Sequence, residues 1–175
     1  MTAEIRALDD ADDYRAAIPG LAALIVDAVD GGAGVNFLAG TTDEQAAAWW
    51  RARLDAVRAG VVTVFVAVGG DGTLLGSTLI ERSTNQNSPH RAEIGKVLVL
   101  RSARRQGLAT ALMAAAEARA RADGRWLLLL DTVAGSPADA MYRHLGWQEF
   151  GVVPAHAFAT DGTPQPTTFF YKDLR

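Results

Sequence analysis

The residues best placed for chemistry lie in a basic loop that joins an apolar strand to a long amphipathic helix. The loop and the first helical turn span residues 101–110, with the sequence RSARRQGLAT. The first turn of a helix has backbone amides without internal partners and the positive end of the helix dipole, so anions bind there. Gly107 and Ala109 leave room for a phosphate group to approach the backbone. Three arginines add positive charge to this loop of an otherwise acidic chain: Arg101, Arg104 and Arg105. The pattern predicts a pyrophosphate site.

The same residues also fit an interpretation without a ligand. A solvated basic loop that only starts a helix explains the pattern without any ligand. Other nucleotide motifs do not match, because Gly95-Lys96-Val97 lacks the hydroxyl residue of a Walker loop. The glycines within residues 69–72 are better explained by a hairpin turn than by a dinucleotide-binding fingerprint.

Composition restricts the class of protein. The chain has 175 residues, 49% hydrophobic and 21% charged, with a net charge of −3, which predicts one globular domain over residues 1–175. The acidic balance argues against nucleic-acid binding, and no apolar run reaches the roughly 18 residues of a membrane span. Cysteine is absent and the three histidines lie far apart, so we expect neither disulfides nor a metal site. We expect a cytoplasmic protein.

Hydrophobic periodicity and turn residues predict the elements that position the loop. Strands are predicted at 4–8, 61–68, 74–82, 92–100, 126–131, 147–153 and 167–174, and helices at 9–30, 43–59, 105–123 and 138–145. Pro19 predicts a break in the first helix, and Thr42 with Gln45 predicts a capping box before the second. Gly95 predicts a bulge. The apolar run 127–130 is typical of a strand buried on both faces.

The order of these elements predicts an α/β fold with a mixed sheet. Strand 92–100, helix 105–123 and strand 126–131 form a βαβ crossover, which requires parallel strands. The predicted turn at 70–73 joins an antiparallel pair instead. Helices are expected on both faces of the sheet.

The loop and a downstream segment resemble a known superfamily. Arg104-x-x-Gly107-x-Ala109 is similar to the Q/R-x-x-G-x-G/A signature of the GCN5-related N-acetyltransferases (GNAT), and residues 140–147 resemble their A-x-x-Y-x-x-x-G-F/W segment. The order of elements agrees over nearly the whole chain. Residues 130–136 and 161–174 resemble the tabtoxin-resistance-type branch. The resemblance implies the GNAT fold, a mostly antiparallel twisted sheet of about seven strands with one parallel, splayed pair.

The resemblance implies acetyl-CoA as the cofactor. In GNAT proteins the strand before the loop pairs through its backbone with the pantetheine arm, and the loop wraps the pyrophosphate. The strand residues that match are Val97, Leu98 and Val99. The loop residues that match are Arg104, Arg105, Gln106, Gly107, Leu108, Ala109 and Thr110. One departure is that Gly135 or Ser136 stands where many members have an Asn that contacts the CoA arm.

Acetyl transfer to an amine needs a base, because an amine of pKa about 10.4 is neutral in roughly one molecule per thousand at pH 7. The candidates are Glu93, upstream of the predicted bulge, and Asp131, at the end of a predicted buried strand. Asp131 follows four leucines, so we expect a partly desolvated carboxylate with a raised pKa. A turn-forming role for Asp131 and an exposed strand position for Glu93 are the alternatives, and Glu81 is a weaker third candidate.

The resemblance also suggests roles for these residues. In tabtoxin-resistance-type relatives, acidic residues at the positions of Glu93 and Asp131 are put forward as bases. Tyr142 matches the tyrosine that acts as a general acid toward the CoA thiolate. The alternative for Tyr142 is a helix aromatic packed on the sheet. No metal is implied.

In this fold the acceptor pocket is built by the first two helices, the loop between them and the last strands. Asn36, Phe37 and Trp50 are the predicted substrate contacts. Trp49 and Trp50 point about 100° apart on a helix, so one is expected to pack inward and the other to border the cleft. Simple packing remains the alternative for each of these side chains.

The sequence therefore predicts an acyltransferase. The leading hypothesis is an acetyl-CoA-dependent N-acetyltransferase that acts, with a carboxylate base and direct attack, on the primary amine of a small molecule such as an amino-acid-like antimetabolite or antibiotic. Two alternatives stay open: a peptide or protein N-terminal acetyltransferase, and a non-catalytic acyl-CoA-binding regulatory module. We expect no nucleic-acid or membrane partner, and a monomer or homodimer.

Overall fold

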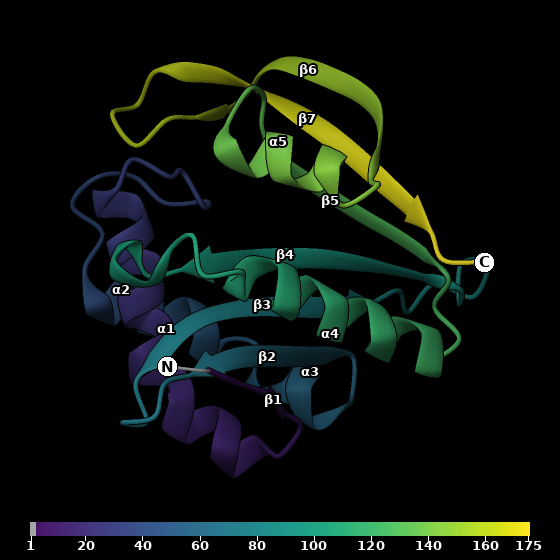
Figure 1. The fold of residues 1–175 in the computed structure, drawn as a ribbon, viewed down its shortest axis with the longest axis horizontal. Coiled ribbons are helices and arrows are strands. Elements are labelled where there is room, and N and C mark those ends of the chain that lie inside the picture. The colour runs from purple at the N-terminus through teal and green to yellow at the C-terminus, as the bar shows by residue number, and fades with distance from the viewer. Residues whose placement is uncertain (1–2) are drawn as a thin grey trace.

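A seven-stranded sheet organises the chain in the computed structural model, which describes residues 3–175 (Figure 1). The strands are β1 Glu4–Leu8, β2 Val62–Val68, β3 Leu74–Arg82, β4 Arg91–Val99, β5 Leu127–Val133, β6 Gln148–Phe158 and β7 Pro164–Asp173. The helices are α1 Ala11–Asp30, α2 Asp43–Arg51, α3 Leu54–Arg58, α4 Leu108–Ala122 and α5 Pro137–His144, with a 3-10 turn at Arg101–Ala103. The strand order is β1-β2-β3-β4-β5-β7-β6. The mixed fold predicted from the sequence is confirmed.

Helices cover both faces of the sheet and bury two separate hydrophobic clusters. Alternation along β2 sends Val64 and Val66 to the cluster under α1, α2 and α3, and Phe65 and Ala67 to the cluster under α4. Figure 1 shows α4 and α5 on the same side of the sheet. Among residues 3–175, no helix is long and apolar enough to cross a membrane.

The parallel pair β4 and β5 is paired at one end only. Arg91, Ala92 and Glu93 pair with residues 127–129, and every other pair of neighbouring strands is antiparallel. Beyond Glu93 the two strands diverge, as Figure 1 shows. Within the described part of the chain, the remaining length of β4 therefore has no strand partner on its β5 side. This is the splayed pair that the GNAT resemblance implied.

A bulge in β4 lies at the start of this divergence. The register changes between the pairs Leu79–Gly95 and Ser77–Leu98. Over this interval β4 contains one residue more than β3, and the extra residue forms the bulge. Lys96 adopts a φ of +50°, in the left-handed region that side chains rarely occupy. The Ser77 hydroxyl donates to the Lys96 carbonyl at 3.1 Å and holds the bulged backbone in place. The bulge predicted near Gly95 is present, and its strained residue is the lysine that follows.

Two helices differ from the sequence prediction. α1 continues through Pro19 without a break, because its long apolar face packs on the sheet and outweighs a loss of roughly 3 kcal/mol from one interior proline. The capping box of Thr42 and Gln45 is confirmed. The helix predicted over 43–59 is instead two helices, α2 and α3, separated at residues 52–53. This separation turns the Arg53 side chain back onto α2.

Two strand predictions also need correction. β5 is not buried on both faces: Leu128 and Leu130 are buried, whereas Leu127 and Leu129 are only partly covered. Leu128 and Leu130 face the hydrophobic cluster under α4, whereas Leu127 and Leu129 point to the opposite face. β6 extends to Phe158 through residues predicted as a loop, because it pairs with β7 along a long irregular hairpin.

Gly76 lets β3 and β4 approach each other beside the diverging edge. A Cβ at this position would lie 2.7 Å from the Leu98 carbonyl oxygen and 3.1 Å from Leu112. We expect Gly76→Ala to lower the free energy of unfolding by about 1–3 kcal/mol, because backbone must move to relieve the clash. Urea denaturation measures this. Gly70→Ala is the control, since its Cβ would meet no atom within 4 Å. Equal stability of the two variants would contradict the close approach.

Candidate active site

The N-terminus of α4 presents free backbone amides and is the candidate anion site. Gly107 caps the helix with a φ of +78°. The first hydrogen bond of the helix runs from the Ala111 amide to the Gly107 carbonyl. The amides of residues 108–110 therefore have no acceptor within the helix. The side chains of Arg104, Arg105 and Gln106 are exposed beside them. A phosphate group placed here meets free amides, the helix dipole and positive charge.

The three arginines of the loop are not equivalent. Asp27 of α1 holds Arg101 through its backbone amide at 2.8 Å and its Nε at 2.9 Å. Arg101 is therefore committed to an ion pair, contrary to its predicted place beside the phosphate. Arg104 and Arg105 are exposed, and Arg104 Nε lies 3.4 Å from the Val99 carbonyl oxygen. These two arginines are the ones left to meet an anion.

The unpaired edge of β4 leads directly into this anion site. Residues 97–99 end the strand, and the 3-10 turn and Gly107 follow along the chain. Their backbone groups on the β5 side have no strand partner among residues 3–175. An elongated molecule with amides along one part and phosphates at one end fits this edge and helix terminus together.

The turn before α5 does not offer the side chain that many GNAT proteins use for the CoA arm. The Ser136 hydroxyl caps α5 by accepting the Asp139 amide at 3.2 Å. The Gly135 amide donates to the buried Asp139 carboxylate at 2.7 Å, and Thr168 donates to the same oxygen at 3.1 Å. Both candidate replacements for the asparagine are therefore occupied in holding this turn.

Three carboxylates lie on one face of the sheet. Glu81 pairs with Glu93 across β3 and β4, and Glu93 pairs with Leu129 of β5. Paired residues point to the same face, and so do residues two apart along a strand. Asp131 follows Leu129 by two positions, so it shares this face. The face is the one that α1, α2 and α3 cover, because Leu79 belongs to their hydrophobic cluster.

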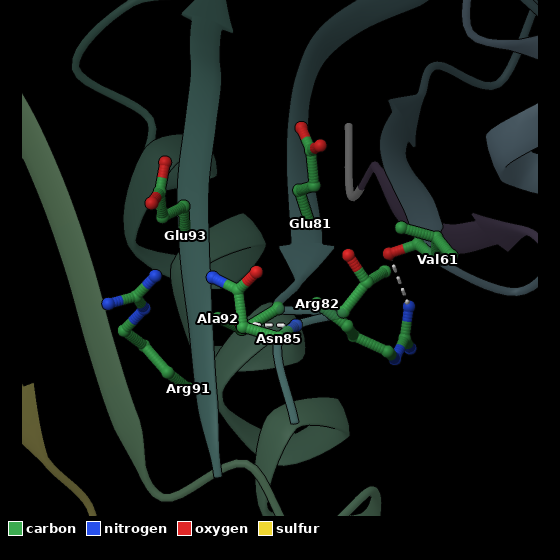
Figure 2. Close-up of a pocket in the computed structure, with 9 residues that line it drawn as sticks. Val61, Glu81, Arg82, Asn85, Arg91, Ala92 and Glu93 are labelled. Atoms are coloured by element: carbon green, nitrogen blue, oxygen red, sulfur yellow. Dashed lines mark hydrogen bonds between the residues drawn. The ribbon is translucent and has the colours of Figure 1, made fainter. Parts of the chain in front are cut away.

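Glu93 lies where the pairing of β4 and β5 ends. It lines a cavity of about 200 Å³ together with Glu81, Arg82 and Arg91. Figure 2 shows the Glu81 and Glu93 side chains on neighbouring strands, on the same side of the sheet. Glu93 is exposed, which matches the alternative weighed for it. The carboxylate is nonetheless accessible from the face that carries Asp131.

Asp131 lies two residues beyond the last paired position, on the diverging part of β5. Its side chain is exposed, so the desolvation expected from the preceding leucines is absent. Its charge acts on two other groups. Burial raises the pKa of the Tyr142 phenol well above its usual value, and Asp131 raises it further. Asp131 also partly opposes the lowering of the Lys96 pKa. The carboxylate is therefore electrostatically coupled to Tyr142 and Lys96.

Tyr142 projects from α5 into the hydrophobic cluster on the other face of the sheet. It is 5% exposed and packs against Trp147 and Phe170, with ring centroids 6.2 and 6.1 Å away. No group in the described part of the chain accepts a hydrogen bond from its hydroxyl. Because its pKa is raised, the hydroxyl keeps its proton across the neutral range. Tyr142 can therefore act as a donor and not as a base.

The two adjacent tryptophans have different environments. Trp50 is 0% exposed, and its carbonyl accepts the Tyr14 hydroxyl at 2.7 Å. It cannot contact an acceptor in this conformation, so its predicted substrate contact is corrected. Trp49 is only partly buried, and its ring lies 3.1 Å from Arg53 Cζ and 4.3 Å from Lys96 Nζ. Of the pair, Trp49 faces the charged groups.

The loop between α1 and α2 contains the other predicted substrate contacts. Phe37 packs edge-on against Trp49, with ring centroids 6.5 Å apart, and Asn36 is exposed with a φ of +71°. The Ala39 amide donates to the Thr160 carbonyl at 2.8 Å, which ties this loop to the β6–β7 hairpin. The structure thus brings the loop and the last strands together, as the predicted pocket requires.

The last strands place aromatic side chains next to Asp131. Phe169 of β7 pairs with Asp131 and is partly buried. Its ring lies 5.0 Å from the His156 ring and 6.0 Å from the Phe150 ring. Asp131 therefore lies beside an aromatic surface on β6 and β7.

Sequence reasoning missed Arg53 and Lys96. Arg53 lies in a predicted helix and carries no local signal. Lys96 carries a weak one, because Lys96 and Lys172 are the only lysines among the 17 basic residues of the chain. A lone charge inside the apolar strand 94–100 could have been singled out.

Comparisons with known proteins agree with this geometry. The model of the acetyltransferase (GNAT) family matches residues 34–147. An N-acetyltransferase from Staphylococcus aureus Mu50 superposes with a TM-score of 0.80 at 19% identity, covering 100% of both chains. A ribosomal-protein-alanine N-acetyltransferase from Brucella melitensis gives 0.75 at 26% identity, covering 98% of this chain and 99% of the other. A phosphinothricin acetyltransferase from Sinorhizobium meliloti, in complex with AcCoA, gives 0.78 at 21% identity, covering 99% and 89%.

The family model covers well over half of the chain, including β4, the anion-binding loop and α5. The splayed strands and the free amides at the start of α4 match what the family resemblance implied, and the bulge matches the prediction made from Gly95. The chain therefore belongs to the GNAT family of acetyltransferases.

Proposed function

We propose that this protein transfers an acetyl group from acetyl-CoA to the primary amine of a small molecule, with Asp131 as the general base. One observation supports this above the others. Asp131 lies on the diverging part of β5, coupled to Tyr142, while the unpaired edge of β4 beside it leads to the anion site at Gly107. A base, a proton donor and a phosphate site are thus arranged around one opening in the sheet.

The binding surface fits acetyl-CoA in its chemistry. The edge of residues 97–99 offers unpaired backbone groups to pantetheine amides, and the amides of residues 107–110 with Arg104 and Arg105 offer partners to the pyrophosphate. When bound, acetyl-CoA supplies an acetyl group activated as a thioester. The AcCoA complex of the Sinorhizobium meliloti protein, which has the same fold, supports this choice.

The residues of this chain divide the proton transfers between them. Asp131 accepts a proton from the acceptor ammonium group, which makes the amine nucleophilic and contributes about 10²–10⁴-fold. Tyr142 holds a proton at its hydroxyl, available for the departing sulfur. Glu93 of β4 lies on the same face of the sheet as Asp131 and pairs with Leu129, two residues before Asp131. Glu93 is the second candidate base and would act through water.

A second candidate is acetylation of peptide or protein N-termini. The 26% identity to the ribosomal-protein-alanine N-acetyltransferase favours it, and an α-amine of pKa about 8 needs less help from a base. We favour the small molecule because the hydrogen bond between Ala39 and Thr160 joins the α1–α2 loop to the β6–β7 hairpin. We expect this connection to leave less room for an extended peptide than an open cleft would.

A thiol-release assay tests the proposal. The protein is mixed with acetyl-CoA and a panel of small amines, amino acids and short peptides, and free CoA is measured against a control without acceptor. We expect release above the control with some of the small amines or amino acids and not with peptides. Release with peptides alone would show the second candidate to be right. Binding of acetyl-CoA without release for any acceptor would indicate a non-catalytic module.

A further inference from the structure

Two positive charges from distant parts of the chain meet on one tryptophan. Arg53 comes from the junction of α2 and α3, and Lys96 from the bulge of β4. Arg53 Cζ lies 3.1 Å from the Trp49 ring centroid, and Lys96 Nζ lies 4.3 Å from it. Arg53 also donates to the Trp49 carbonyl at 2.9 Å, which holds the guanidinium in place. The three side chains form a cluster that we call the cation pair on Trp49.

The cation pair makes no direct ion pair, although Glu81 acts on Arg53 and Asp131 acts on Lys96 from a longer range. Among residues 3–175, no carboxylate lies within 4.0 Å of Arg53 or Lys96. Two other well-covered cations are paired, since Arg82 binds Asp123 and Lys172 binds Glu117 at 2.8 Å, whereas the half-buried Arg91 and Arg125 make no ion pair within residues 3–175. Covered like charges without a partner are costly unless an anion joins them.

The titration behaviour of Lys96 agrees with this cost. Burial and the neighbouring charge of Arg53 together lower the pKa of Lys96 to about 8, and Asp131 partly opposes this shift. Burial also lowers the pKa of Arg53. Each group therefore favours an added negative charge close to it.

The backbone of Lys96 is held in a strained conformation that fixes where its side chain starts. Its φ of +50° is in the left-handed region, which is strained for a non-glycine residue. The Ser77 hydroxyl holds its carbonyl at 3.1 Å. Strain of this kind persists where the surrounding structure over-determines it, and it is concentrated at functional sites.

The position of the cation pair indicates what the anion belongs to. Trp49 packs against the hydrophobic cluster under α1, α2 and α3, on the same face of the sheet as Asp131, and the Asp131 charge acts on Lys96. Resting on the proposed function, we propose that Arg53 and Lys96 bind a carboxylate of the acetyl acceptor, so that the acceptor is an amino acid whose ammonium group is directed to Asp131. A free carboxylate and an amine a few bonds apart match the two opposite charges of the site.

Paired acceptors test this inference by kinetics. Each amino acid is compared with its own amide, which keeps the amine and the side chain but lacks the negative charge. We expect kcat/KM to favour the acid by about 10–100-fold, the size of one or two hydrogen bonds between charged groups. Lys96→Met and Arg53→Gln should bring this ratio down toward one. Arg58→Gln, an exposed arginine of α3 paired with Asp55, should keep it.

The outcomes separate the inference from the proposed function. Equal use of acids and amides by the unaltered protein would overturn the carboxylate site and leave the acetyltransferase proposal intact. A preference that survives in both Lys96→Met and Arg53→Gln would also overturn it. If no amine is acetylated, the proposed function fails, and the carboxylate site is then decided by binding.

Binding is measured on Lys96 directly. Protein labelled with ¹³C-lysine gives signals from Lys96 and Lys172 alone, and Lys172 is an internal control because it is paired with Glu117 at 2.8 Å. With CoA present, we expect amino acids to shift the Lys96 signal and to raise its titration midpoint above about 8, because an anion favours the charged amine. The matching amides should change neither the position of the Lys96 signal nor its titration midpoint. A Lys96 signal that no amino acid moves would overturn the inference.

Discussion

Asp131→Asn is expected to lower turnover by about 10²–10⁴-fold while acetyl-CoA binds as before. Asparagine keeps the size of the side chain but cannot accept a proton from the acceptor ammonium group. An amine of pKa about 10.4 is then neutral in roughly one molecule per thousand at pH 7. The side chain is exposed on the diverging part of β5, so the substitution removes no internal packing. The loss should therefore fall on kcat and not on stability.

Turnover by thiol release and acetyl-CoA affinity by calorimetry measure this prediction. Glu93→Gln and Glu81→Gln test the second and third candidate bases, since both carboxylates lie on the same face of the sheet as Asp131. The turnover of Asp131→Asn should also rise about tenfold per pH unit below the pKa of the amine, as the neutral amine becomes more abundant. If Asp131→Asn kept full turnover while Glu93→Gln lost it, the base would be Glu93.

Gly107→Glu is expected to weaken acetyl-CoA binding by about 100-fold or more, the equivalent of losing one or two hydrogen bonds to a charged group. The new carboxylate competes for the free amides of residues 108–110 and repels the pyrophosphate. The backbone here has a φ of +78°, which costs a non-glycine residue about 1–2 kcal/mol. A Cβ would meet no atom within 4 Å, so we expect the variant to fold.

Gly124→Glu is the matched control at the opposite end of α4. Gly124 has a φ of +70° and open space around its Cβ, so the strain and the added charge are alike while the anion site is untouched. Calorimetry should show near-normal acetyl-CoA affinity for this variant. Near-normal acetyl-CoA affinity in both the Gly107 and the Gly124 variant would mean that the pyrophosphate is bound elsewhere. Loss of binding in both would instead indicate a global effect on α4.

Local patterns made much of the fold predictable. A capping box depends on residues three apart, and the order of strands and helices follows from periodicities within short windows. The boundaries of β1, β3 and α5 are found within about two residues of their predicted positions. The predicted break of α1 at Pro19 is wrong. Packing of the whole apolar face of α1 on the sheet outweighs the local helix-breaking preference of proline.

The candidate site was predictable where one segment builds it. Gly107 and the first turn of α4 are consecutive in sequence, and a helix terminus presents free amides wherever it lies. Arg101 was misjudged because its partner, Asp27, is 74 residues away. The choice between Trp49 and Trp50 likewise depended on which indole the sheet and Tyr14 would cover.

The amino-acid sequence by itself determined the order of the elements, the crossover that makes β4 and β5 parallel, and the free amides at the start of α4. Only the tertiary structure decided where β4 and β5 part, that Asp131 is exposed, and that Arg53 and Lys96 meet on Trp49. The physical reason is range: hydrogen bonds of caps and turns join near neighbours, whereas burial and the pairing of charges depend on segments that only folding brings together.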